Sequence, residues 1–349
     1  MVEQPFFAPV AAYSYPDMPL RQIVDMLFAI KNIDQLQSVV MRHCVEQIIS
    51  STMTHFSYDL SPEVVSGKPY LFVSNHRDIT LDAMLLDYVL LTNGIATPQI
   101  MFGSNLLGVP FMGDFGRLNK MVSIERGGTP HEFYTRMNEL SSYIRTVETD
   151  LGESVWLAQR NGRTKDGLDQ TDPAVVKMLM LSNPGEPVQA LAQLNIVPCT
   201  ISYEWEPCDL LKTKECCLAK REKYVKAPDE DAHSVISGIK ADKGHVHLVV
   251  GKPLSIEEIE ATHGDARSMA ALLDSKINAA YRIHASSRVA SWWLQNGRAP
   301  EPSSTYPQDT IDELHRRLEQ LQSDEERTFL LGIYASPLSN QSTTPVECR

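Results

Sequence analysis

A histidine and two aspartates stand together where an apolar run gives way to a helix-like pattern. Residues 70–74 are a candidate buried strand, and residues 74–82 (SNHRDITLD) continue from its last residue. A histidine that leaves the carboxyl end of a buried strand lies where open α/β sheets bind their ligands. A carboxylate that accepts the Nδ1 proton of His76 would leave Nε2 available as a general base. The segment therefore predicts acid–base chemistry.

Two carboxylates compete to be the partner of His76. Asp78 is two residues further along and still in the turn, whereas Asp82 begins a helical pattern and can point back toward the ring. We favour Asp82 and keep Asp78 as the alternative. The same spacing also fits a His76 that only caps a helix or loop.

Basic side chains gather in a second segment, residues 160–167 (RNGRTKDG). Gly162 would let the backbone approach an anion closely, while Arg160, Arg163 and Lys165 bring positive charge. Arginine can also bind phosphate oxygens in a bidentate manner. The segment is a candidate phosphate site, although an ordinary basic turn has the same composition.

The composition excludes several classes of protein. The chain has 349 residues, of which 43% are hydrophobic and 22% charged, as in globular proteins. Its net charge of −12 provides no general basic field for nucleic acid. The six cysteines form no C-x-x-C pair and are expected to be reduced thiols. No apolar run is long enough to span a bilayer, and the N-terminus does not resemble a signal peptide. We expect a cytoplasmic protein that is soluble or peripheral on the membrane.

Short apolar runs alternate with helical patterns after residue 69. The strand candidates are 70–74, 121–124, 154–158, 196–201 and 245–250, and the helix candidates between and after them are 81–91, 130–147, 173–181 and 267–289. This alternation predicts an α/β fold with a mostly parallel central sheet flanked by helices.

Helical periodicity over residues 20–57 adds an N-terminal helical subdomain, residues 1–60. The α/β domain would then cover residues 61–295. Residues 296–349 are expected to form a charged helix, about 309–327, followed by a disordered tail over the last dozen residues.

Residues 74–82 resemble the first motif of the glycerolipid acyltransferases, N-H-x4-D. Asn75 and His76 match its first two positions, and five residues instead of four precede Asp82. The simplest interpretation is one extra residue in the turn. Residues 116–126 (GRLNKMVSIER) are similar to the second motif, an apolar strand that ends in arginine. The resemblance implies that Arg126 binds the phosphate of the acyl acceptor and that Lys120 assists.

Residues 156–167 (WLAQRNGRTKDG) resemble the third motif of the same family, which implies substrate binding by Arg160, Asn161, Gly162, Arg163 and Lys165. Asn161 replaces the usual glutamate, the usual proline is absent, and one residue is missing before Arg163. Residues 196–199 (IVPC) are similar to the fourth motif, and residues 249–254 (VVGKPL) to a strand near the family's C-terminal end. The motifs occur in the family's order over roughly residues 68–290.

The resemblance implies an O-acyltransferase that moves a fatty acyl group from an acyl thioester to a hydroxyl of a glycerol phosphate or lysophospholipid. His76 would be the general base and Asp82 its partner. The thioester, acyl-CoA or acyl carrier protein, is a substrate, and neither a cofactor nor a metal is expected. Residues 106–112 are a candidate lipid-binding surface. The identity of the acceptor and donor, the chain length and the oligomeric state stay open.

Two other functions fit parts of the pattern. A metal-dependent phosphoesterase would use His76, Asp78 and Asp82 as ligands, with His245 and His247 as a weak second pair. A non-catalytic relative would bind phospholipid or phosphate without turnover.

Overall fold

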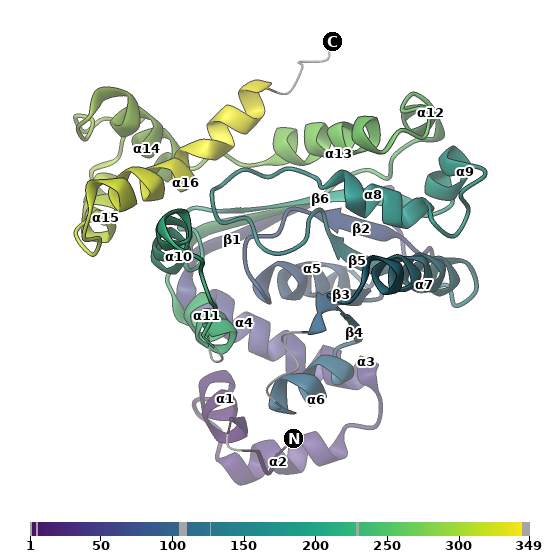
Figure 1. Ribbon diagram of the computed structural model, residues 1–349. Coiled ribbons are helices and arrows are strands. Elements are labelled where there is room, and N and C mark those ends of the chain that lie inside the picture. Colours follow the sequence, from purple (N-terminus) through teal and green to yellow (C-terminus); the bar gives the residue numbers. More distant parts are fainter. Residues whose placement is uncertain (1, 5, 105–109, 126, 228–229, 344–349) are drawn as a thin grey trace.

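A seven-stranded sheet forms the centre of the computed structural model, which describes residues 2–4, 6–104, 110–125, 127–227 and 230–343 (Figure 1). In chain order the strands are β1 (Met53–Leu60), β2 (Leu71–Ser74), β3 (Gln99–Gly103), β4 (Met121–Ile124), β5 (Val155–Ala158), β6 (Ile196–Tyr203) and β7 (Gly244–Val250). Their order in the sheet is β1-β7-β6-β2-β5-β3-β4. Strands β6, β2, β5, β3 and β4 are parallel, whereas β7 is antiparallel to β6 and β1 is parallel to β7. The predicted mostly parallel sheet is confirmed.

The central strands are apolar on both faces because helices cover both. In β2, Phe72 packs into one layer while Leu71 and Val73 pack into the other, as the alternation of side chains along a strand requires. The first layer contains α4 (Arg42–Thr52) and α5 (Leu81–Thr92). The second layer contains α7 (Pro130–Thr149), α8 (Pro173–Met180), α9 (Pro187–Ala192), α12 (Ile256–Glu260) and α13 (Ala266–Ala280).

The remaining helices lie around this sandwich (Figure 1). The N-terminal group comprises α1 (Phe7–Ser14), α2 (Leu20–Ala29), α3 (Ile33–Gln35) and the π-helical segment η1 (Leu36–Met41), and it lies next to α6 (Pro110–Leu118). Helices α10 (Asp209–Arg221) and α11 (Glu230–Lys240) connect β6 to β7. A C-terminal group with its own apolar core comprises α14 (Ala285–Asn296), α15 (Gln308–Leu318) and α16 (Asp324–Thr343). Among the described residues, every helix is too short or too polar to cross a bilayer.

All five predicted strands are present, but β1 and β3 were not predicted. The helix expected over residues 20–57 is wrong after residue 52, because residues 53–60 instead pair with β7 at the edge of the sheet. The helix expected over residues 267–289 is two helices. The chain leaves the first at Tyr281, with φ −68° and ψ 123°, and the backbone N–H of Arg282 donates to the Ser202 hydroxyl.

The C-terminal region also differs from the prediction. The charged helix expected near residues 309–327 is divided between α15 and α16. Part of the expected disordered tail, residues 338–343, continues α16, and residues 344–349 lie outside the described part of the chain. The division into domains at residues 60 and 295 stays a prediction.

Candidate active site

His76 and Asp82 form a hydrogen-bonded pair at the carboxyl end of β2. The His76 Nδ1 lies 2.8 Å from the Asp82 Oδ2, and the Asp82 side chain is only 2% exposed. His76 keeps 14% of its side chain accessible, and its ring meets the Trp156 ring edge-on at 5.6 Å. Five residues between His76 and Asp82 therefore still place the two groups in contact.

The Asp82 carboxylate has a partner for each of its oxygens. Besides His76, Oδ2 accepts from the backbone N–H groups of Arg77 at 2.6 Å and Asp78 at 2.9 Å. Oδ1 accepts from the Tyr203 hydroxyl at 2.8 Å. Because an ionised carboxylate only accepts hydrogen bonds, it holds the proton of His76 on Nδ1. The Nε2 atom then has its lone pair free.

Asp78, the alternative partner of His76, has another role. Its Oδ1 accepts from the backbone N–H groups of Thr80 at 2.9 Å and Leu81 at 3.0 Å, so it caps the start of α5. The cap fixes the first turn of the helix that carries Asp82. Asp78, Asp82 and His76 thus do not converge on one point. Across the described residues, three or more metal-binding side chains never gather where they could hold an ion.

The loop after β5 is joined directly to the loop that carries His76. The Thr164 N–H donates to the His76 carbonyl at 2.7 Å, and the Gln159 N–H donates to the Ser74 carbonyl at 2.8 Å. These bonds place the basic residues 160–165 beside the histidine.

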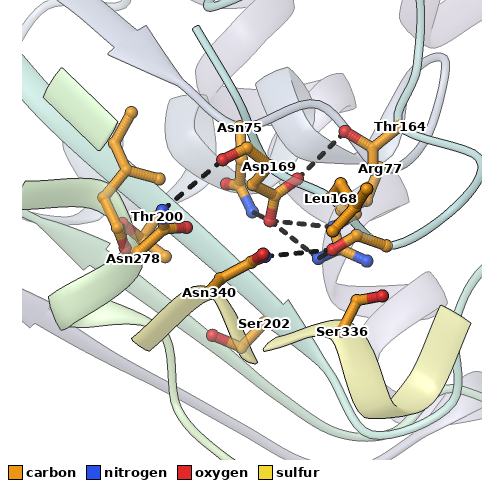
Figure 2. Close-up of polar contacts among 12 residues, drawn as sticks. Asn75, Arg77, Thr164, Leu168, Asp169, Thr200, Ser202, Asn278, Ser336 and Asn340 are labelled. Atoms are coloured by element: carbon orange, nitrogen blue, oxygen red, sulfur yellow. Dashed lines mark hydrogen bonds and ion pairs between the residues drawn. The ribbon is translucent and has the colours of Figure 1, made fainter. Parts of the chain in front are cut away.

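A buried ion-pair network joins the loop after β2 to the loop after β5 (Figure 2). The guanidinium of Arg77, which is 1% exposed, lies 2.7 Å from the Asp169 carboxylate and 3.2 Å from the Glu206 carboxylate. Asp169 also accepts from the Asn75 side chain at 3.0 Å and the Thr164 hydroxyl at 2.9 Å. Residues on both sides of His76 are therefore tied to the basic loop.

The C-terminal helix α16 holds the same loop from the other side. The Asn340 side chain donates to the carbonyl of Gly167 at 3.1 Å, and the Ser336 hydroxyl donates to that of Asp166 at 3.0 Å. Figure 2 shows Asn340 and Ser336 on α16. A Cβ on Gly167 would lie 2.4 Å from the Ile333 carbonyl oxygen, and its φ is +80°. Only glycine allows this close approach of loop and helix.

A cavity of about 420 Å³ opens in front of His76. Polar residues line one part of it, namely His76, Arg160, Asn161, Gly162, Arg163 and Lys165. Apolar side chains line much of the rest, among them Met84, Ile100, Phe102, Met121, Phe133, Met137 and Met178. A polar end joined to an apolar space suits a ligand that has a charged head and a hydrocarbon chain.

The predicted substrate-binding residues differ in where they lie. The five predicted loop residues all line the cavity, namely Arg160, Asn161, Gly162, Arg163 and Lys165, and Gly162 has a φ of +79°. Arg163 has a buried Nη1 with no hydrogen-bond partner among the described residues. Lys165 already forms an ion pair with Glu215.

The second-motif residues are not brought to the site in the same way. Lys120 precedes β4, at the end of the parallel strands opposite His76, and its Nζ donates to the Thr97 carbonyl at 3.2 Å. The predicted assistance by Lys120 in phosphate binding stays a prediction. Arg126 lies outside the described residues, as does most of the predicted lipid-binding stretch, residues 106–112.

Four supporting residues were not predicted: Arg77, Asp169, Tyr203 and Glu206. Arg77 carries the only sequence signal, because a charged residue next to His76 directly after a buried strand needs a partner. The partners of Arg77 come from segments about a hundred residues away, so the local sequence pattern does not predict them.

Comparison with known proteins gives the fold and the site a family. Residues 55–202 match the family model described as "Acyltransferase". The matched segment is an acyltransferase domain by this model. This domain contains His76, Asp82 and the basic loop, and the resemblance drawn from the motifs is confirmed.

Individual relatives agree with the acyltransferase domain. Glycerol-3-phosphate acyltransferases of Xanthomonas axonopodis pv. citri and Xanthomonas campestris pv. campestris are each 26% identical over 232 residues, which cover 65% of this chain. The match spans only 24% of the length of either relative. The crystal structure of the 1-acyl-sn-glycerophosphate (LPA) acyltransferase PlsC from Thermotoga maritima aligns with 78% of this chain and 92% of its own, with a TM-score of 0.43 and 13% identity.

Proposed function

We propose that the chain transfers a fatty acyl group from an acyl thioester to the hydroxyl of a glycerol phosphate or a lysophospholipid. The observation that carries the proposal is the His76–Asp82 pair at the polar end of the cavity. The donor is acyl-CoA or the acyl thioester of acyl carrier protein. Peripheral association with the cytoplasmic face of a membrane would bring lipid substrates to the cavity.

His76 acts as the general base. The acceptor hydroxyl donates to Nε2, which takes its proton as the oxygen attacks the thioester carbonyl. The buried Asp82 carboxylate stabilises the imidazolium that results. The tetrahedral intermediate then collapses, the C–S bond breaks, and the thiolate receives the proton from His76. The products are the ester and the free thiol.

The acceptor's phosphate binds at the basic loop. Arg163 is the principal contact because its buried Nη1 lacks a partner among the described residues, and Arg160 adds a second positive charge at the cavity wall. Asn161 and the backbone at Gly162 complete the contact surface. Lys165, which is paired with Glu215, provides a weaker and more distant contribution.

Substitution of His76 tests the catalytic step. His76→Ala should reduce turnover by about 10²–10⁴-fold with little change in thermal unfolding. The exposed His131 on α7 provides a matched control, and His131→Ala should keep full activity. Products of glycerol-3-phosphate and 1-acylglycerol-3-phosphate, each offered with acyl-CoA and acyl carrier protein donors, are measured by mass spectrometry. Undiminished transfer by the His76 variant would rule out the assignment.

Substitution of Arg163 tests the phosphate site. Arg163→Gln should raise KM for the phosphorylated acceptor much more than KM for the thioester donor. Arg288→Gln removes the same charge at an exposed position and should leave both constants unchanged. Equal effects of the two variants would contradict phosphate binding at the loop. Phospholipid binding without product from any donor–acceptor pair would favour the non-catalytic alternative.

A further inference from the structure

A small group of polar side chains lies inside the cavity, at a distance from His76. Gln37 of η1, Asp87 of α5 and Thr97, which precedes β3, all line the cavity wall. Gln37 is 3% exposed and Thr97 is 4% exposed, so neither lies at the protein surface. We call these three residues the inner polar group.

Two members of the inner polar group lack hydrogen-bond partners in the described part of the chain. The Gln37 Oε1 accepts from the Thr97 hydroxyl, but the Gln37 Nε2 is buried without a partner. Turning the amide over would leave its oxygen unpaired instead. The Asp87 Oδ1 is also buried and unpaired. Buried polar atoms are nearly always hydrogen-bonded, so these two atoms, on residues that line one cavity, call for partners that the described residues do not supply.

The inner polar group lies at the opposite end of the sheet from the catalytic pair. His76 follows the carboxyl end of β2, whereas Thr97 precedes the parallel β3. Since β3 has five residues, it separates its two ends by roughly 15 Å at about 3.3 Å per residue. An acyl chain whose thioester lies at His76 would therefore reach the inner polar group with its distal carbons.

The chemistry of the group favours a hydroxyl. Burial raises the pKa of Asp87 well above its ordinary value, against the opposing charge of Lys120, and so favours the neutral carboxyl group, which can both donate and accept. The Gln37 amide also offers a donor. A hydroxyl matches both, whereas a bare hydrocarbon would leave both unpaired.

We propose that the cavity is built for an acyl chain that carries a hydroxyl at or near its distal end, bound by Asp87 and Gln37. This inference rests on the proposed function, because it assigns the donor's acyl class at the same cavity. The thioester end reacts at His76 while the hydroxyl end is held by the inner polar group.

Competition between donors tests the selectivity. Unsubstituted and ω-hydroxylated acyl thioesters from octanoyl to myristoyl are offered in equimolar pairs, and the product ratio from mass spectrometry gives the ratio of kcat/KM. At the preferred length the ω-hydroxyacyl donor should win by about 10-fold to 100-fold. β-Hydroxylauroyl donors carry their hydroxyl near the thioester and should show no advantage. Equal or lower use of ω-hydroxyacyl donors at every length would overturn the inference and leave the proposed function intact.

Two variants at one position locate the recognition. Asp87→Asn keeps a hydrogen-bonding group of the same shape and should retain the preference. Asp87→Leu should abolish it, because leucine offers the hydroxyl neither a donor nor an acceptor. A preference that survives in Asp87→Leu would overturn the assignment.

Calorimetric titration with free laurate and ω-hydroxylaurate provides a readout that does not require turnover. Tighter binding of ω-hydroxylaurate by the wild type, lost in Asp87→Leu, supports the inner polar group even if every donor–acceptor pair fails to give product. In that case only the proposed function would fail. Equal binding of the two fatty acids by the wild type would overturn the inference, and waters would be the partners of the unpaired atoms.

Discussion

Asp82→Asn removes one negative charge and keeps the shape of the side chain. The asparagine oxygen can occupy the position of Oδ2, where it still accepts from His76 and from the backbone N–H groups of Arg77 and Asp78. Its NH₂ group then faces the Tyr203 hydroxyl, which can accept. The exchange therefore isolates the charge from the geometry.

The magnitude follows from the distance between the charges. The 2.8 Å contact between the His76 Nδ1 and the Asp82 Oδ2 places the centres of the imidazolium and carboxylate charges about 4 Å apart. At an effective dielectric constant of about 20, their attraction is about 4 kcal/mol. Because about 1.4 kcal/mol changes a rate tenfold, kcat should fall by about 10²–10³-fold.

Steady-state rates at saturating donor and acceptor provide the measurement, with thermal unfolding as a check on folding. Tyr203→Phe is the matched control, because it removes one hydrogen bond to Asp82 and keeps the charge. It should cost less than about tenfold in kcat. If Asp82→Asn works at close to the wild-type rate, or if Tyr203→Phe is the more damaging change, the carboxylate does not stabilise a cation formed on His76.

Three further predictions concern stability. Arg77→Met leaves the buried Asp169 carboxylate without its cation, while Glu206 keeps its ion pair with Lys212, and should lower the free energy of unfolding in urea by about 3–5 kcal/mol; a loss below 1 kcal/mol would contradict the network. In Gly238→Ala the new Cβ would lie 2.1 Å from the Asp78 Oδ2, so we expect the free energy of unfolding to fall by about 1–3 kcal/mol. In Gly332→Ala, on α16, the new Cβ meets nothing within 4 Å, so we expect the free energy of unfolding to rise by about 0.5–1 kcal/mol. Equal melting temperatures for the two glycine variants would refute this contrast. Burial lowers the pKa of His284 to about 3, so between about pH 6.5 and pH 4 the unfolded chain binds a proton that the native chain does not. The free energy of unfolding should therefore fall by about 1.4 kcal/mol for each pH unit of acidification from this residue, and His284→Phe should reduce that slope, as urea titrations at several pH values would show.

Much of the sheet could be predicted from the sequence, because strands covered by helices on both faces are continuous apolar runs. β2 and β6 are buried along their whole length and were recognised. β1 was missed because it lies at the edge, where four of its eight positions are exposed and three are partly exposed, and only pairing with β7 identifies it as a strand. Tertiary pairing outweighed the helical periodicity of the preceding residues.

The site was predictable where its parts are close in sequence. Six positions separate His76 from Asp82, and a helix that begins between them can turn the carboxylate toward the ring. Arg77 and Asp169 are 92 positions apart, and Gln37 and Thr97 are 60 apart. Such pairs depend on how the helices pack on the sheet, which no local pattern encodes. For Lys120 the motif gives its neighbourhood in sequence and not the end of the strand at which it lies, before β4.

The hydrogen bonds between α16 and the basic loop have a consequence for protein engineering. Residues 55–202 alone would retain the His76–Asp82 pair. They would lose the hydrogen bonds that Ser336 and Asn340 donate to the carbonyls of Asp166 and Gly167. A chimera that contains only the matched segment would lack the hydrogen bonds that fix the basic loop, so the loop would be less rigid. Any exchange of substrate preference between relatives must therefore carry the final helix along with the catalytic core.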